Sequence, residues 1–557
     1  MLRSDLQILL ILVLHLVLTA LPGVAAALLA ARLGVRGVPV LLAIGMAATG
    51  AVALLAFWLY YADPLVGESF SYLAVLGPAA LSGWLLYERR LPGELLRQLA
   101  PPLGLWALGS LFLVFLGFIH GGADAPLSTA ASRFIGPLPA DNDIPAFFAE
   151  WFYRHGHDGA PPVFPGEWLS SDRPPLQVGY ALSQYPFGWD EDKLHYQVLA
   201  VVLQQLWIVG LWALLLAARV GRVTRALTMV TVLVSGLAIV NGFYVWPKML
   251  PAALLLAAAA LVLTPLWEEL RRSLWGAALL AGLCALALLA HGGSVFGIIP
   301  LALVAAYRGL PSWRWIGVAA LVGIALMAPW SAYQKYADPP GNRLVKWTLA
   351  GVVEIDDRGT LETLGDAYGE AGFDGALHNK GQNFVTMVGG GPMVDTVQSA
   401  LDSGGADDLI GAGKAISFFN LFPSLGLLLL APVAMLLGRR RGPPAGEWSF
   451  ALVCFAAVLI GALAWGLLVF GSEALRTVLH VGSYLVPVLA MAGAVAGLRA
   501  SFPRFAIAWV GLWILISLVL YTPAQLPPPD TSYSVLAGIL AALGLGGFAA
   551  LALDSRA

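Results

Sequence analysis

Residues 249–266 read MLPAALLLAAAALVLTPL, eighteen positions without one charged side chain. A helix needs about 20 mainly apolar residues to cross a bilayer, so this run predicts a membrane span. Such runs recur along the 557 residues, of which 59% are hydrophobic and 11% charged. A soluble domain carries about 25% charged residues. The composition therefore predicts an all-α, polytopic membrane protein, and the net charge of −2 gives no sign of a nucleic-acid partner.

We count about 13–15 candidate spans by length and apolar content. Two of them, 226–243 and 294–307, have tight flanks and are the weakest. The full set of candidates is 6–31, 37–60, 69–87, 101–120, 196–218, 226–243, 249–266, 274–291, 294–307, 315–333, 413–438, 449–470, 480–498, 504–521 and 532–553.

The arginines test this count, because cytoplasmic loops are enriched in Lys and Arg. If the 32–36 loop lies inside, every alternate loop is basic, which places the N-terminus outside and the C-terminus inside. A cleaved signal peptide over residues 1–30 is the alternative for the first span. It would require Arg32 and Arg36 to be translocated, so we favour a retained helix. The arginines of the inside loops are Arg32 and Arg36; Arg89, Arg90 and Arg97; Arg219, Arg222 and Arg225; Arg271 and Arg272; Arg308 and Arg314; Arg439, Arg440 and Arg441; Arg499 and Arg504; and Arg556.

This topology divides the chain into five segments with two long loops on the outer side. Loops of this length without a domain of their own are usually functional or disordered. The segments are the N-terminal transmembrane helices 1–120, the first outer loop 121–195, the central helices 196–333, the second outer loop 334–412 and the C-terminal helices 413–557.

The first outer loop carries Asp141-Asn142-Asp143 directly before an amphipathic stretch. Apolar residues fall at i, i+3, i+4, i+7 and i+8 from Ile144, which predicts a helix over 144–155 whose aromatic face lies in the membrane interface. Asp143 or Asn142 suits the N-cap of this helix. Asp141 lies further out, so capping explains it less well. The alternative role of a carboxylate here is a general base that takes a proton from an attacking hydroxyl.

The acidic residues, the helix and the turn Arg173-Pro174-Pro175-Leu176 follow one another in an order that resembles a known group. It is similar to the first outer loop of the bacterial protein O-mannosyltransferase and aminoarabinose (lipid A) transferase group, within the GT-C superfamily of membrane glycosyltransferases. That loop has an Asp-Glu pair, a helix with small residues at fixed offsets, and a Lys-Pro-Pro-Leu turn. Placing Asp141 on the acidic pair puts Ala146 and Ala149 on the small positions.

The sequence also departs from this group. Asn142 stands where the family has Glu, which leaves open whether Asp141 or Asp143 is the base. Arg173 stands where the family has Lys; it keeps the charge and adds a fork suited to phosphate, unless it is a surface cation paired with Asp172. Three to four helices precede the acidic loop, whereas the family usually has one.

Other polar residues fall on the same side of the expected topology. Lys248 is either an interfacial anchor or a phosphate ligand, and His291 has a structural interpretation. Arg343 and Lys346 share a face if their segment is helical; they are either ligands of the donor phosphate together with Arg173, or solvated charges. Further candidates for the site are Asp172 and His378 in the two loops, and Arg476, His480 and Tyr484 at the start of a late span.

The resemblance implies a GT-C glycosyltransferase on the outer face of a bacterial cytoplasmic (inner) membrane. Its donor would be a polyprenyl-phosphate-linked sugar and its acceptor a lipid, glycan or protein, with Asp141 or Asp143 as the catalytic base and inversion at the anomeric carbon. No nucleotide cofactor is expected, and a divalent cation shared by Asp141, Asp143 and the phosphate stays open.

Two other classes remain. An O-antigen ligase or polysaccharide polymerase would take glycan from a lipid pyrophosphate and depend on His378. A transporter would place polar residues at the centres of its helices, which are almost free of charge here.

Overall fold

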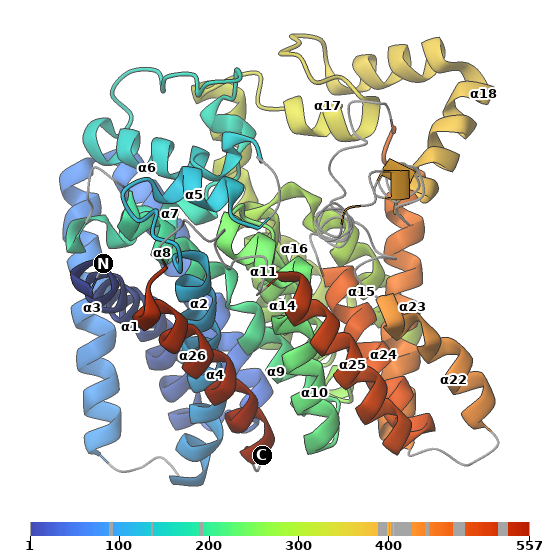
Figure 1. Cartoon of the computed structure of the whole chain (residues 1–557). Helices are drawn as coiled ribbons and strands as arrows, with labels where there is room; N and C mark the ends of the chain where they lie inside the picture. Colours follow the sequence, from blue (N-terminus) through green and yellow to red (C-terminus); the bar gives the residue numbers. More distant parts are fainter. Residues whose placement is uncertain are drawn as a thin grey trace.

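The structure is a computed structural model that describes residues 2–88, 93–134, 138–188, 193–387, 398–399, 401–402, 405, 426–439, 445–471, 485–521 and 533–555. Within these ranges every regular element is a helix, and the strand-like contact that occurs is one isolated bridge between Phe164 and Trp168. The helices run mostly side by side along one direction (Figure 1). The all-α expectation is confirmed.

Four long helices form the N-terminal part. Asp63 separates the second from the third: its carboxylate accepts hydrogen bonds from the amides of Leu65 (2.7 Å) and Val66 (3.2 Å), so the chain reverses within a single residue. An Asp at the N-cap followed by Pro is a strong helix start. These helices are α1 (Leu2–Arg32), α2 (Val38–Ala62), α3 (Pro64–Tyr87) and α4 (Gly93–Gly117).

The central helices surround α12, in which every residue is buried. Helix α12 packs against α9, α14 and α2. The candidate span 226–243 is broken into α10 and α11, which meet at 52° beside Ser235, the N-cap of α11. The central helices are α8 (Leu194–Gln204), α9 (Trp207–Ala217), α10 (Arg222–Leu233), α11 (Gly236–Tyr244), α12 (Met249–Val262), α13 (Trp267–Leu270), α14 (Leu274–Ala290), α15 (Val295–Arg308) and α16 (Trp313–Ala332).

The C-terminal helices complete the bundle on both sides. Helix α24 packs between α22, α23 and α25, whereas α26 returns to pack along α4 at the N-terminal side. In Figure 1 the N-terminus lies at the left of the bundle, above the C-terminus, which lies at the lower edge. The C-terminal helices are α22 (Leu430–Gly438), α23 (Ala445–Leu468), α24 (Leu485–Ser501), α25 (Pro503–Tyr521) and α26 (Val535–Asp554).

Among the described residues, nine helices are long and apolar enough to cross a membrane, or ten if the bent pair α10–α11 counts as one span. Four further apolar helices are shorter: Met249–Val262, Leu274–Ala290, Gly292–Arg308 and Leu485–Ser501. The chain is thus a multi-pass membrane protein, as the composition predicts. The other expected spans correspond to the bent pair and to these four shorter helices, except 413–438, of which residues 413–425 lie outside the described residues.

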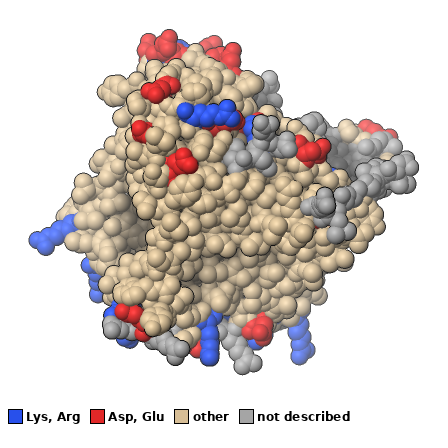
Figure 2. Space-filling view, turned by 90° about the vertical axis from the view of Figure 1, so that its left-hand side faces the viewer, with Lys and Arg blue, Asp and Glu red and all other residues tan. Residues whose placement is uncertain are grey.

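The surface has the charge distribution of a protein that sits in a bilayer. Lys and Arg gather at the lower edge in Figure 2, Asp and Glu gather mainly at the top, and the band between them is largely free of charge. Exposed Leu, Ile and Val side chains on α1, α3, α16 and α25 suit contact with lipid.

The elements of both long loops lie at the upper end of the bundle in Figure 1. The amphipathic helix α6 spans Ile144–His155, as the sequence predicts, and buries Phe148 and Phe152 against the bundle. The first loop contains α5 (Pro126–Ser132), a 3-10 turn Ala140–Asn142, α6, a second such turn Ser170–Asp172 and α7 (Leu176–Gln184). The second loop contains a π-helical turn Tyr333–Ala337, α17 (Arg343–Ala350) and α18 (Thr360–Met387).

Candidate functional site

The carboxylates of Asp141 and Asp143, directly before α6, pair with two different cationic side chains. The Asp141 carboxylate accepts a hydrogen bond from the Arg173 guanidinium at 3.1 Å, and both side chains are nearly buried, at 15% and 11% exposure. The Asp143 carboxylate pairs with Lys193 at 2.7 Å. Asp143 occupies the N-cap position of α6, as predicted, but its side chain makes no cap hydrogen bond. Lys193, 50 residues further along the chain, binds it instead.

Arg173 is held on the face of an indole. Its guanidinium carbon lies 4.1 Å from the ring centroid of Trp168, and that of Arg343 lies 4.5 Å from the same ring. Such cation–π contacts gain strength when water is excluded. The interpretation of Arg173 as a surface cation paired with Asp172 is therefore wrong: Arg173 is buried and pairs with Asp141, whereas Asp172 pairs with Arg343 at 3.4 Å. Burial lowers the pKa of Arg173, although Asp141 and Asp172 oppose that shift.

Lys248 and His291 form a second basic group next to Arg173. Lys248 precedes α12, is fully buried, and its amine lies 3.8 Å from the centroid of the Trp246 ring. Its Nζ is in hydrogen-bond contact with His291 Nε2, and His291 Nδ1 accepts a hydrogen bond from the Gly293 amide at 3.0 Å. Burial is the main cause that lowers the pKa of both side chains, and the nearby Arg173 lowers it further.

These basic groups border a large apolar cavity. Its volume is about 530 Å³, and Arg173 and His291 lie in its wall beside aromatic side chains of α15, α17 and α23. A smaller cavity bordered by Asp141 and Gln177 shares Arg173 and His291 with it. The two basic side chains therefore stand between Asp141 and an apolar space. The aromatic residues of the large cavity are Trp246, Phe296, Trp347 and Trp465.

A chain of amides holds the irregular backbone below the site. The Gln204 side-chain oxygen accepts from the amides of Met249 (2.9 Å) and Leu250 (3.0 Å), which open α12. Its nitrogen donates to Gln177 (3.0 Å), and Gln177 donates to the Tyr196 hydroxyl (2.8 Å). Backbone groups at membrane depth require such partners, because lipid offers none.

The Tyr196 hydroxyl continues this chain to the acidic residues by donating to the Asn142 carbonyl at 3.3 Å. One hydrogen-bonded path therefore links the helix start beside Lys248 to the backbone between Asp141 and Asp143.

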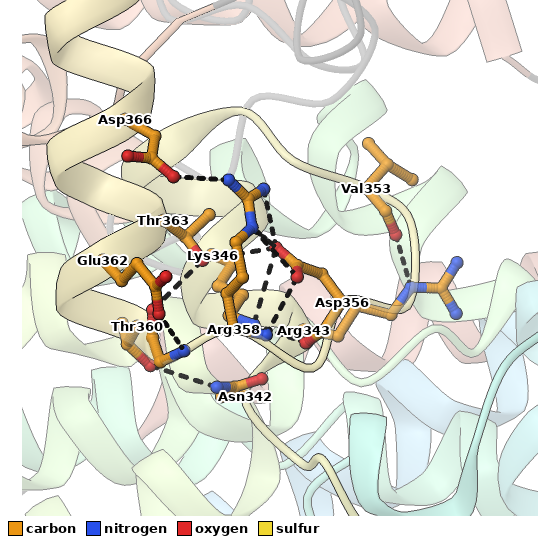
Figure 3. Close-up of polar contacts among 11 residues, drawn as sticks. Asn342, Arg343, Lys346, Val353, Asp356, Arg358, Thr360, Glu362, Thr363 and Asp366 are labelled. Atoms are coloured by element: carbon orange, nitrogen blue, oxygen red, sulfur yellow. Dashed lines mark hydrogen bonds and ion pairs between the residues drawn. The ribbon is translucent and has the colours of Figure 1, made fainter.

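Arg343 and Lys346 are both on α17, as expected from their spacing, but they bind protein groups. Arg343 donates to the carbonyls of Val353 (2.5 Å) and Glu167, and its side chain is 4% exposed. Lys346 points toward Asp356, with which Arg358 also pairs at 2.8 Å (Figure 3). Hydrogen bonds from Arg358 hold the pKa of Asp356 well below its usual range. The structure thus places Arg343 in the contact between the two loops, whereas Lys346 is bound within the second loop.

Two other side chains of the second loop form hydrogen bonds with the turn Ser170–Asp172, which directly precedes Arg173. The Asp338 carboxylate accepts from the Ser170 hydroxyl (2.6 Å) and from the Ser171 amide (2.9 Å). Gln334 donates to the Ser171 carbonyl at 2.9 Å. The position of Arg173 therefore depends on the second loop.

Of the remaining predicted residues, His378 is described and is not brought to this site. His378 lies on the exposed side of α18. Arg476, His480 and Tyr484 lie outside the described residues. No group of three or more His, Cys, Asp or Glu side chains suited to a metal ion occurs in the described part of the chain. Cys454 is buried, Cys284 is half-buried, and both are free thiols.

Sequence reasoning missed His291, Trp168, Lys193 and the glutamines as parts of the site. The signals were weak: a His before two glycines, and two Gln residues in the short apolar helix α8 with a third directly after it. Comparison with protein-family models, with curated proteins and with solved structures finds no match.

Proposed function

We propose that this protein is a membrane glycosyltransferase that transfers a sugar from a polyprenyl-phosphate donor to a lipid, glycan or protein acceptor. The reaction would take place on the outer face of a bacterial cytoplasmic membrane. This proposal joins the GT-C resemblance of the first loop with the arrangement of the groups that the loop brings together.

One observation carries the proposal: a buried carboxylate and a set of buried basic groups meet at the wall of an apolar cavity. Asp141, Arg173 and His291 border the adjoining cavities, and Lys248 contacts His291. A prenyl chain matches the apolar wall, and a phosphate matches the guanidinium and the amine. An acceptor hydroxyl needs a base at the opposite side of the anomeric carbon, where Asp141 would lie.

Arg173 has two roles in this proposal. In the structure it binds Asp141, which keeps a nearly buried carboxylate paired. A donor phosphate competes for the same guanidinium, so donor binding weakens the pair and leaves Asp141 available to accept the proton of the acceptor hydroxyl. Arg173 and Lys248 then stabilise the negative charge that develops on the leaving phosphate. Asp143 is held by Lys193 and has a positioning role at the start of α6.

The test is transfer from a panel of labelled polyprenyl-phosphate sugars by purified protein in membranes. Asp141→Asn is expected to lower the rate of the active donor by about 10²–10⁴-fold, the usual contribution of a general base. Asp143→Asn should lose less than Asp141→Asn. Asp158→Asn, in the same loop at 88% exposure, is the matched control and should keep full activity.

The other outcomes separate the alternative functions. Full activity in Asp141→Asn would remove the base from the proposal. Turnover only with lipid-pyrophosphate glycans, lost in His378→Ala, would favour a ligase or polymerase, although His378 lies on an exposed helix face. Uptake of a solute without bond transfer would favour a transporter. A divalent cation at the aspartates remains an open part of the proposal, and chelation during the same assay tests it.

A further inference from the structure

A separate apolar cavity lies between α1, α2, α4 and the start of α9, away from the site described above. Its volume is about 240 Å³. An apolar cavity of roughly 150 Å³ already stays free of water and binds an apolar ligand. The wall includes Thr19 and Leu28 of α1, Leu41 and Thr49 of α2, and Leu96 and Trp106 of α4.

The wall of this cavity suits a hydrocarbon chain. Among the described residues that line it, three have a side-chain nitrogen or oxygen, and each of these atoms is bonded within the protein. The Thr19 hydroxyl accepts a hydrogen bond from Gln184 at 2.9 Å, and the Thr49 hydroxyl donates to a carbonyl of its own helix at 3.0 Å. The Trp106 indole donates to a carbonyl of α8 at 2.9 Å. A ligand therefore meets mainly aliphatic groups.

The cavity lies toward the end of the bundle opposite the two outer loops, where Lys and Arg gather (Figure 2). Helix α1 contributes residues of its second half, whereas α2 and α4 contribute residues of their first halves. Two residues of the wall also reach the surface: Leu86, at the end of α3, is 47% exposed, and Ala100 on α4 is exposed. The cavity therefore opens between α3 and α4 toward the surrounding lipid.

Exposed arginines lie at the ends of the helices that form this opening. Ala31 of α1 and Leu96 of α4 pack against the same buried pair of leucines, which brings the end of α1 close to the start of α4. Arg32 and Arg97 directly follow these two residues, and both are exposed. The ion pair of Arg97 with Glu94 has a length of 3.9 Å and is itself exposed, so it is weak.

Other basic residues belong to the same end of the bundle. Arg36, in the connection between α1 and α2, is exposed. By sequence, the connection between α3 and α4 also contains Glu88, Arg89 and Arg90, so basic residues exceed acidic ones. Basic pockets between membrane helices on the cytoplasmic side bind anionic lipid headgroups.

We propose that this cavity binds one anionic phospholipid of the inner leaflet, with an acyl chain between α1, α2 and α4 and its phosphate at Arg32 and Arg97. The acyl chain supplies the dispersion contacts that the lining of an open cavity lacks. The phosphate forms charge-assisted hydrogen bonds with the guanidinium groups. The bound lipid thus joins α4 to α1 and α2, and this inference does not rest on the proposed sugar transfer.

The headgroup charge should decide which phospholipid binds. Phosphatidylglycerol has a net negative charge, whereas phosphatidylcholine with the same acyl chains is neutral overall. Each arginine near the membrane surface contributes about 1 kcal/mol to the attraction of an anionic lipid, which is about fivefold in affinity. Two arginines therefore predict that phosphatidylglycerol binds about 25-fold more tightly than phosphatidylcholine.

The experiment measures lipid binding to the purified full chain in micelles by native mass spectrometry. Dioleoyl phosphatidylglycerol and dioleoyl phosphatidylcholine are titrated separately, and the Kd of the first bound lipid is compared. We expect the preference for phosphatidylglycerol given above, and a rise in the thermal unfolding temperature with that lipid, because a ligand that binds the folded state stabilises it.

One pair of variants tests the cavity. Ala100→Phe places a large side chain at its opening and should remove the tight binding of phosphatidylglycerol. Ala79→Phe makes the same change at an exposed residue of α3 that does not line the cavity, and it should bind this lipid like the unmodified protein. Thermal unfolding without lipid shows that both variants are folded.

A second set of variants tests the arginines. Arg32→Gln and Arg97→Gln should each weaken phosphatidylglycerol binding about fivefold and leave the Kd of phosphatidylcholine unchanged. Arg314→Gln is the matched control, because Arg314 is an exposed arginine near the start of α16 that does not line the cavity. It should keep the affinity of the unmodified protein for both lipids.

Four results would overturn the inference. Equal affinity for the two lipids would show that charge does not select the ligand. Tight binding that persists in Ala100→Phe would place the lipid elsewhere on the protein. Displacement of the lipid by farnesyl methyl phosphodiester, a short analogue of the proposed donor, would assign the cavity to a prenyl chain. Absence of any bound phospholipid would remove the site altogether.

Discussion

The Arg343→Met substitution tests the buried ion pair that joins the two outer loops, between Arg343 on the second and Asp172 on the first. Arg343 is 4% exposed and Asp172 is fully buried, with their charged atoms 3.4 Å apart. Removing the guanidinium leaves the Asp172 carboxylate buried with the Leu169 amide at 2.9 Å as its remaining hydrogen-bond donor in the described structure. Breaking a buried pair in this way costs about 3 kcal/mol, the lower end of the usual range.

The assay is hydrogen exchange of the segment 167–171, whose sequence neither Arg343→Met nor Asp172→Asn changes. A loss of about 3 kcal/mol in the local opening free energy accelerates exchange about 100-fold, since 1.36 kcal/mol is a factor of about ten. The double variant Asp172→Asn with Arg343→Met removes the uncompensated charge. It should recover about 1 kcal/mol or more of the loss, as coupled neighbours do.

The effect should also depend on pH with a defined sign. Burial raises the pKa of Asp172 above its ordinary value of 3.8, and Arg343 opposes that shift. Without Arg343 the pKa rises further, so on acidification the folded variant binds a proton before the unfolded chain does. Stability of the variant relative to the unmodified protein therefore recovers as the pH falls through the folded pKa. Equal exchange acceleration at pH 5 and pH 8, or a double variant as unstable as Arg343→Met alone, would refute this reasoning.

Three further predictions test the packing below and around the site. Gln204→Leu leaves the first two amides of α12 without their hydrogen-bond acceptor. It should lower the free energy of unfolding in detergent by about 1–3 kcal/mol. The control Gln205→Leu should be near neutral, because the buried side-chain amide of Gln205 has no partner in the described structure. Gly179→Ala should cost about 1–3 kcal/mol in the same assay, because the new methyl group would lie 2.1 Å from a backbone oxygen of α2, whereas Gly282→Ala meets nothing within 4 Å and should be tolerated. Lys346→Met should change the Kd for farnesyl methyl phosphodiester, measured by calorimetry, by no more than about twofold, because the Lys346 amine binds Asp356 on the second loop rather than facing the cavity. A larger loss of affinity would indicate that Lys346 binds the phosphate.

The local sequence was sufficient for the amphipathic helix. The 3.6-residue stripe from Ile144 defines a helix whose ends agree with the structure. Asp141 and Arg173 border the same cavity, and their roles as base and phosphate ligand stay predictions. For Asp143 the same local reasoning located the N-cap position but not the partner of the side chain, because a capping aspartate and an aspartate beside a distant lysine look identical in sequence.

Hydrophobic runs determine that this chain is a multi-pass helical membrane protein, because transfer of apolar helices into lipid depends on composition and length alone. The tertiary structure decides which polar residues meet. In the sequence Arg343 and Lys346 carry no sign of a partner. The fold gives Arg343 a carbonyl of the second loop and a carboxylate of the first, and gives Lys346 a carboxylate of the second. In the sequence His291 is a lone histidine. It contacts Lys248 only because the fold brings the segment before α12 close to the segment after α14. Pairing of buried charges depends on positions far apart in the chain, so local sequence carries almost no information about it.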